Sequence, residues 1–300
     1  MALPLQLALV PEGVDIRPSD LTRVASALSK QVNRDFRPLW KVDATVDAFA
    51  SLDEVPTDYW PIIVVPDVKG AAGYHQDQDG QPYAVVEMGP MWSLTASHEC
   101  LEMLADPFGR RLRAGQLLPQ AVALGLPPRR VNYLVEVCDP SEAGAFGYQV
   151  NGVLVSDFYT PEFFDPKPTN GVRYSFTGAI REPRTVLNGG YISWNDPVTR
   201  HWMQLRMFRD PLSDRVPHIV DLSTQTRFNE FLAVESLRGA VDRVTTTPPF
   251  EEMMDAGTAE AFRASYDEVK DAQAARAESI RQQLRALRET EVATEDEYPA

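Results

Sequence analysis

The hydrophobic positions in the first part of the chain have the spacing of a helix and then of strands. Apolar side chains recur at steps of three and four over residues 21–36, which predicts an amphipathic helix with Ser19 or Asp20 as its N-cap. Apolar and polar residues alternate over residues 41–50, and residues 61–68 are a short β-branched run typical of a central strand. We therefore expect a helix that is followed by several strands.

The next segment predicts a strand at residues 83–88 and then a helix with one polar stripe. On a helical wheel of residues 93–105, His98, Glu99 and Glu102 share a sector of about 100°. The rest of the wheel is apolar apart from two small serines, Ser93 and Ser97. Because an unpaired buried carboxylate is costly, this stripe must face water, a partner charge or a metal ion.

The second half of the chain is predicted to be rich in short strands. Residues 131–139 predict a strand that ends in acidic residues. Residues 145–159 predict a hairpin whose turn is Asn151-Gly152, a dipeptide that tolerates positive φ angles. A second hairpin is expected over residues 189–205. From residue 227 the pattern changes to that of helices.

These elements predict an α+β fold with an N-terminal helix and mixed sheet, a helix that carries the candidate site, a hairpin-rich part and a C-terminal helical arm. We expect one domain over residues 1–226, with subdomains at about 1–106 and 107–226. Residues 227–290 are predicted to be a helical region, and between Phe262 and Leu287 its apolar side chains keep roughly the heptad spacing of a coiled coil. Residues 291–300 are predicted to be an acidic, disordered tail.

Composition and charge narrow the classes of function. The net charge of −14 disfavours binding to nucleic acid or to an anionic membrane, and no basic patch interrupts it. No window approaches the roughly 20 apolar residues that span a bilayer, and the N-terminus lacks a basic leader. Two cysteines cannot form a disulfide framework. We therefore expect a cytoplasmic globular protein.

The polar stripe has the layout of a metal site. His98-Glu99-x-x-Glu102 matches the HExxH helix motif of zinc peptidases, with glutamate in place of the second histidine. Residues i and i+4 lie on one helical face and can bind the same ion, while the adjacent glutamate can take a proton from water on that ion. A carboxylate is an acceptable zinc ligand. The alternative is a solvated helix face with a satisfied histidine.

Two segments resemble a known group of proteins. SHECLEMLADP (97–107), followed by EVCD (136–139), resembles the SHExxExxxDP and ExxDxC pattern of zincin-like metallopeptidases. That group includes bacterial secreted proteins and, more distantly, the plant phosphate-induced (Exordium-like) family. In this chain the cysteine lies between the two acids. The chain also resembles a set of bacterial proteins that contain YLVEVCDP and VSDFYTP segments.

The resemblance implies roles for the residues of the stripe. His98 and Glu102 would be metal ligands, and Glu99 would be the general base. The third ligand would come from Glu136 or Asp139, with the other acid orienting a ligand. These two acids could instead pair with nearby arginines, namely Arg110, Arg111, Arg129 or Arg130.

Three further residues are assigned to the surroundings of the ion. Asp106 lies two turns beyond His98, about 12 Å along a straight helix, which is too far to share the ion. Asp106 is predicted to cap a turn or to hydrogen-bond to one of the metal-ligating side chains. Asp157 and Tyr159 could supply a metal ligand or an oxyanion donor, and of the two we expect Asp157 to contact a ligand and Tyr159 to be catalytic.

Other polar residues have simpler interpretations. Residues 77–80, Asp-Gln-Asp-Gly, are a turn rather than a calcium loop, because the remaining oxygen ligands are missing. Cys100 lies opposite His98 on the helix and is expected to be a core thiol. The other three histidines receive no role in the site: His75, His201 and His218.

The predicted function is a zincin-like metallohydrolase that cleaves a peptide bond in a peptide or protein substrate. Zn²⁺ is the expected ion, with tolerance for Mn²⁺ or Ca²⁺ because two carboxylate ligands are hard oxygen donors. The alternative is an inactive zincin-fold binding or assembly protein that forms homo-oligomers, or binds a partner protein, through residues 256–288. A structural component of a larger particle is a third possibility.

Overall fold

The computed structural model divides the chain into two compact units, residues 1–255 and 256–300. The described residues are 4–68, 71–246, 271, 274–275, 278–279 and 281–282. Those of the second unit are helical. Most of the predicted arm and all of the predicted acidic tail lie outside the described residues, so both stay predictions.

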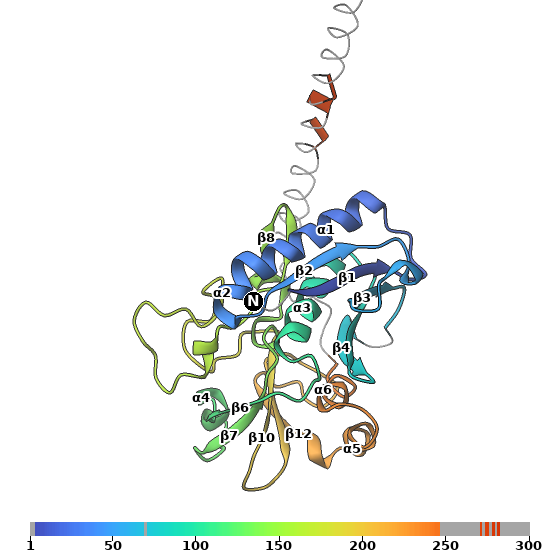
Figure 1. Ribbon diagram of the computed structural model, residues 1–300. Coiled ribbons are helices and arrows are strands. Elements are labelled where there is room, and N and C mark those ends of the chain that lie inside the picture. The colour runs from blue at the N-terminus through green and yellow to red at the C-terminus, as the bar shows by residue number, and fades with distance from the viewer. Residues whose placement is uncertain are drawn as a thin grey trace, which may run out of the picture. The chain divides into compact units, whose positions relative to one another are not determined.

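The first sheet has five strands in the order β2-β1-β3-β5-β4 (Figure 1). The first four are parallel to their neighbours, and β4 is an antiparallel edge strand on β5. Its strands are β1 (Leu5–Pro11), β2 (Ala44–Ala48), β3 (Trp60–Val65), β4 (Gly73–Gln78) and β5 (Gln81–Glu87). The sequence pattern missed β1, whose central residues are buried on both faces and therefore do not alternate.

Helices α1 (Pro18–Gln31) and α3 (Trp92–Ala105) cover the same face of this sheet. α1 packs on β2, whereas α3 packs on β3, β4 and β5, and the two helices also contact each other. The predicted N-cap of α1 was wrong, because the helix begins at Pro18 after Arg17. Proline suits the first helical position, since its fixed φ is already helical. The chain continues through a π-helical turn, Val32–Phe36, into α2 (Arg37–Trp40).

The second sheet is antiparallel, in the order β12-β11-β10-β7-β6. Its strands are β6 (Leu112–Gln116), β7 (Arg130–Leu134), β10 (Tyr191–Asn195), β11 (Trp202–Arg206) and β12 (His218–Asp221). A separate hairpin pairs β8 (Tyr148–Val150) with β9 (Val153–Val155), and both residues of its Asn151-Gly152 turn have positive φ. Both predicted hairpins are therefore confirmed.

The predicted turn at residues 77–80 is also confirmed. Asp79 and Gly80 have φ of 53° and 84°, and they connect β4 to β5 in a two-residue hairpin. The Asp77 carboxylate accepts a hydrogen bond from the Gly80 amide at 3.2 Å. The two acids of this segment thus shape a turn.

The remaining helices are α4 (Pro119–Ala123), α5 (Thr226–Leu232) and α6 (Leu237–Asp242). α6 contacts both α5 and β4, and a small core of the first unit includes Leu222, Phe228 and Val241. The C-terminal helical region was predicted to start at residue 227, but α5 and α6 belong to the first unit because they bury apolar side chains there.

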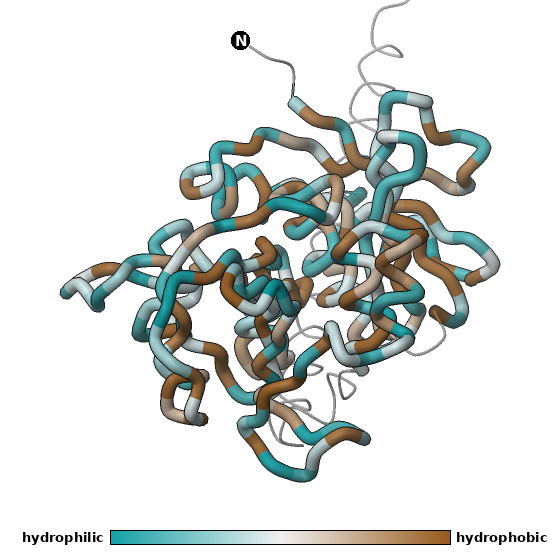
Figure 2. Tube along the Cα trace, turned by 90° about the horizontal axis from the view of Figure 1, so that it is seen from below, coloured by the Kyte–Doolittle hydropathy of each residue, from teal (hydrophilic) through white to brown (hydrophobic). Residues whose placement is uncertain are grey.

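The observed architecture is α+β, as predicted. Hydrophobic and hydrophilic residues alternate along much of the trace, which is typical of elements that bury one face (Figure 2). Among the described residues, no helix is both long enough and apolar enough to cross a bilayer.

Candidate metal centre

Helix α3 is buried on all sides, including its polar stripe. His98 and Glu99 are 4% and 3% exposed, and Glu102 is fully buried. The alternative of a solvated helix face is therefore wrong. Buried carboxylates need partners of opposite charge, so the arrangement around α3 determines what this stripe can do.

Three of the predicted ligands come together. Nε2 of His98 lies 3.3 Å from Oε2 of Glu102 and 3.2 Å from Oδ1 of Asp139. Candidate donor atoms of these three residues lie within 4.8 Å of one another, so the group could hold a metal ion. The other Glu102 oxygen accepts a hydrogen bond from the Cys138 amide at 3.0 Å, which fixes the carboxylate. Between the two candidate third ligands, the geometry favours Asp139 over Glu136.

Arg238 of α6 is the residue that sequence reasoning missed. It is 2% exposed, and its guanidinium lies 3.0 Å from both Glu102 Oε2 and Asp139 Oδ2 and 2.8 Å from Asp242 Oδ2. It also contacts the Glu136 carboxylate. The acids at 136 and 139 thus pair with a distant arginine. The only signal in the sequence was a charged residue within an otherwise apolar turn of helix.

Two of the four nearby arginines that were considered as partners have other roles. Arg129 pairs with Asp196 at 2.8 Å. The Arg111 amide donates to the Asp106 carboxylate at 2.6 Å, and its side chain donates to the Ala105 carbonyl at 2.7 Å. Asp106 therefore closes the turn at the end of α3, in the geometry expected of a capping acid.

His75 was assigned no role, yet β4 places it in the centre. It is fully buried and stands opposite Ala84 of β5 in the sheet register. Nε2 lies 3.1 Å from the Asp106 carbonyl, whereas Nδ1 lies 3.4 Å from Glu99 Oε2 and 4.0 Å from Glu102 Oε2. His75, Glu99 and Glu102 form a second group that could hold an ion. Recognising β4 from its Asp-Gly turn would have placed His75 beside α3.

The two remaining predicted residues lie in different environments. The Tyr159 hydroxyl is buried and has no hydrogen-bond partner among the described residues. Burial, together with the charges of Glu102 and Asp139, raises its pKa well above the ordinary value, so it stays protonated beside the cluster. The Asp157 carboxylate instead accepts hydrogen bonds from the amide and hydroxyl of Thr177 at 2.9 and 3.0 Å. Asp157 therefore stabilises the loop that contains Thr177.

His201 and His218 lie in ion pairs of their own. His201 Nδ1 is 2.7 Å from an Asp221 oxygen, and His218 Nε2 is 3.3 Å from an Asp210 oxygen. Cys100 is fully buried, as expected for a core thiol, and burial raises its pKa to about 12.

The cluster carries more negative than positive charge. The Arg238 guanidinium contacts four carboxylates, those of Glu102, Glu136, Asp139 and Asp242, and a fifth, that of Glu99, faces His75 beside them. Burial raises the pKa of Asp139, and the Glu102 charge raises it further. Burial would lower the pKa of His98, but the Glu102 and Asp139 carboxylates hold it well above 6.5. The centre therefore favours an added cation.

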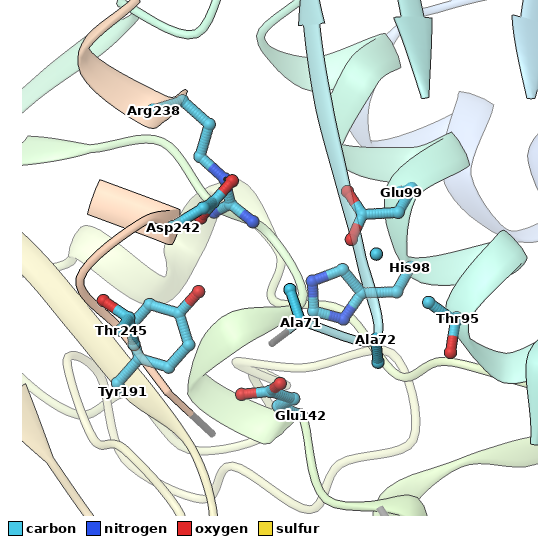
Figure 3. A pocket seen from close by; sticks show the side chains of 11 residues that line it. Ala71, Ala72, Thr95, His98, Glu99, Glu142, Tyr191, Arg238, Asp242 and Thr245 are labelled. Atoms are coloured by element: carbon cyan, nitrogen blue, oxygen red, sulfur yellow. Dashed lines mark hydrogen bonds and ion pairs between the residues drawn. The ribbon is translucent and has the colours of Figure 1, made fainter. Parts of the chain in front are cut away.

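A cavity of about 30 Å³ opens beside these residues. His98 and Glu99 line it from α3, whereas Arg238 and Asp242 line it from α6, as Figure 3 shows. Tyr191 of β10 also reaches it. A water needs about 10–15 Å³ of such space, so the cavity can take a water or an ion but no peptide.

The chain matches no protein-family model, and comparisons with curated proteins and with solved structures yield no match. Zincin-like identity therefore stays a prediction that depends on the motif. The geometry adds that buried histidine, glutamate and aspartate groups of this chain could hold a metal ion.

Proposed function

We propose that this protein is a zincin-like, metal-dependent hydrolase that acts on peptide bonds. The observation that carries the proposal is the convergence of His98, Glu102 and Asp139 within 4.8 Å, with Glu99 on the next position of the same helix. The donor set fits a divalent ion, because it joins an imidazole nitrogen to carboxylate oxygens. Within the described part of the chain, Oε1 of Glu136 and Oδ1 of Asp139 also have no hydrogen-bond partner.

In this proposal, different residues bind the ion, accept the proton and donate a hydrogen bond. His98, Glu102 and Asp139 hold the ion, and the Cys138 amide keeps Glu102 in place. A bound ion would polarise a water molecule and a substrate carbonyl. Glu99 lines the cavity and is positioned to accept the proton of that water. Tyr159, protonated and lacking a hydrogen bond, is available as a donor to developing negative charge.

Two carboxylates and one imidazole are a harder donor set than two imidazoles with one carboxylate. We propose Zn²⁺ as the ion, with Mn²⁺ or Ca²⁺ accepted more readily than by a site with two histidines. A cytoplasmic location is part of the same proposal.

The direct test combines metal content with hydrolysis. Wild-type protein prepared without chelator should contain bound metal and cleave members of a fluorogenic peptide library. Glu99→Gln should lower cleavage by at least 100-fold and retain at least one ion per chain, because the ion is held by other residues. Asp157→Asn is the matched control, since that acid bonds to Thr177 outside the ion-binding group. Hydrolysis that survives Glu99→Gln would exclude Glu99 as the base.

A second candidate function is an inactive zincin-fold assembly protein. The observation that favours it is Arg238, whose guanidinium already contacts Glu102, Glu136 and Asp139 and supplies a counter-charge to them. The small cavity points the same way. Metal-free wild-type protein whose thermal midpoint is unchanged by EDTA would support this function over the hydrolase.

A further inference from the structure

The hydrogen bonding of His75 determines which of its nitrogens carries a hydrogen. Nε2 lies 3.1 Å from the Asp106 carbonyl oxygen, which can only accept. Nε2 is therefore the N–H donor. In the neutral imidazole, Nδ1 then presents its lone pair to Glu99 Oε2 at 3.4 Å and Glu102 Oε2 at 4.0 Å. A backbone carbonyl that fixes the distal nitrogen in this way is the usual support of a metal-binding histidine.

Three acceptors that face one another in a buried site favour a cation between them, and the Arg238 guanidinium contacts only one of the three, Glu102. We propose that His75, Glu99 and Glu102 form a second divalent-metal site, so that the protein holds a two-metal centre in which Glu102 is shared. Within each of the two groups, the candidate donor atoms lie within 4.8 Å of one another. Glu102 belongs to both groups. All three residues of the second group are buried.

The charge of the cluster is consistent with two ions. Five carboxylates gather around a single guanidinium. With all five carboxylates ionised and both histidines neutral, one divalent ion leaves an excess of two negative charges, and a second divalent ion removes it. Buried charge that is left unbalanced is costly, because each ion loses its hydration on burial.

The second site deepens the proposed function and rests on it, because both ions would act on one reaction centre. Glu99 would bind the second ion through Oε2, the oxygen that faces His75. Its other oxygen, Oε1, lies beside Gly73, where an added Cβ would come within 3.0 Å of it. That oxygen remains free of the ion and can accept the proton.

His218 has contacts similar to those of His75 but lies outside both groups that could hold a metal ion. One of its nitrogens also meets a backbone carbonyl, that of Arg215 at 2.8 Å, and the other faces Asp210. The Asp210 carboxylate, however, is already paired with Arg206. The acid that faces His218 is therefore balanced by an arginine, whereas Glu99, the carboxylate nearest to Nδ1 of His75, forms no ion pair with an arginine or lysine among the described residues. His218 is therefore the matched control.

The experiment counts ions in the full-length protein. Chelator-treated protein is dialysed against Mn²⁺ or Zn²⁺ and bound metal is measured by plasma mass spectrometry. Wild type should bind two ions per chain, His75→Leu one, and His218→Leu two. Electron paramagnetic resonance of wild type loaded with two Mn²⁺ should show exchange coupling through the shared carboxylate, and this readout requires no substitution.

Each outcome separates the two proposals. One ion in wild type, with no coupled signal and no change in His75→Leu, would overturn the second site and leave the hydrolase proposal intact. No ion in any variant would overturn both. Two ions that persist in a folded His75→Leu protein would show that the second ion binds elsewhere, which also overturns the inference.

Discussion

The carboxylate of Glu102 has a different task for each oxygen. Oε1 accepts the Cys138 amide, whereas Oε2 faces Arg238 at 3.0 Å and His98 at 3.3 Å. Burial would raise the pKa of Glu102, but Arg238 and His98 hold it below its usual range. Glu102 therefore remains charged, and its charge joins α3 to both the Cys138 segment and α6.

Replacing Glu102 should destabilise the fold as well as the centre. Glu102→Ala removes a buried contact of the Arg238 guanidinium at 3.0 Å and leaves the Cys138 amide without its acceptor. We expect the free energy of unfolding to fall by about 3 kcal/mol or more, as for a broken buried ion pair. Chemical denaturation measures this, with exposed Glu182→Ala as the control, which should change stability by less than about 0.5 kcal/mol. An equal effect of both variants would contradict the assigned role.

The thiols should be unreactive in the folded protein. Burial raises the pKa of Cys100 to about 12 and that of Cys138 well above its ordinary value, so neither is a thiolate at pH 8. A coloured disulfide reagent should titrate no cysteine in native protein and two in denaturant. Rapid reaction of a native thiol would show that one cysteine is accessible.

Asp242 should make stability depend on pH. Burial raises its pKa to about 7 despite Arg238, above the value of about 3.9 for an unfolded chain. Folded protein then binds more protons between these values, so this group's stabilising contribution at low pH is lost as the pH rises toward 7. Relative to wild type, Asp242→Asn should gain stability from pH 5 to pH 8. Exposed Asp53→Asn should show no such trend.

Sequence reasoning found the residues that the helical wheel exposes and missed those that other elements bring in. His98, Glu99 and Glu102 lie on one predicted helix, so their proximity follows from helical spacing alone. His75 lies on a strand without a clear hydrophobic alternation, and Arg238 lies at least 99 residues along the chain from Glu102, Glu136 and Asp139. Contacts of that kind depend on tertiary packing, which one-dimensional spacing does not contain.

At the scale of elements, the centre depends on tight approaches between backbones. An added Cβ at Gly190 would come 2.5 Å from the Asp139 carbonyl and 2.8 Å from the Pro140 carbonyl. These atoms belong to the 3-10 turn Asp139–Ser141, which presents the candidate ligand. The start of β10 thus sets the position of Asp139.

Gly190→Ala should push this turn away from α3. We expect a loss of about 1–3 kcal/mol in the free energy of unfolding, typical of overpacking, and weaker metal binding by the His98 group. Calorimetry of metal binding and of unfolding tests both effects. Gly89→Ala is the matched control, because an added Cβ there meets nothing within 4 Å. Unchanged affinity for the metal ion in Gly190→Ala would show that the turn adjusts to the added methyl group without displacing Asp139.

Regular elements were more predictable than their edges. The hairpins with Asn-Gly and Asp-Gly turns followed from the turn chemistry, whereas β1 lacked alternation because it is buried on both faces. The N-cap of α1 was predicted at Ser19 or Asp20, because serine and aspartate often cap helices. The helix instead begins at Pro18, whose φ is already helical.

At the scale of the whole molecule, the predicted arm remains to be tested. Residues 256–288 have heptad-like apolar spacing and are expected to pair subunits. Truncation after residue 248 should convert an oligomer into a monomer, as measured by light scattering, without changing the metal content of the first unit. The same mass per particle in both proteins would contradict pairing through this segment.

The burial of Arg238 also has a consequence for synthesis. The acids that it neutralises, from Glu102 to Asp139, leave the ribosome well before it, and its amide must still reach the Gly109 carbonyl at 3.0 Å. A nascent chain that stops short of α6 therefore holds mutually repelling carboxylates with no guanidinium among them. Assembly of the centre must wait until translation has passed residue 238, which ties its completion to the last stage of building the first unit.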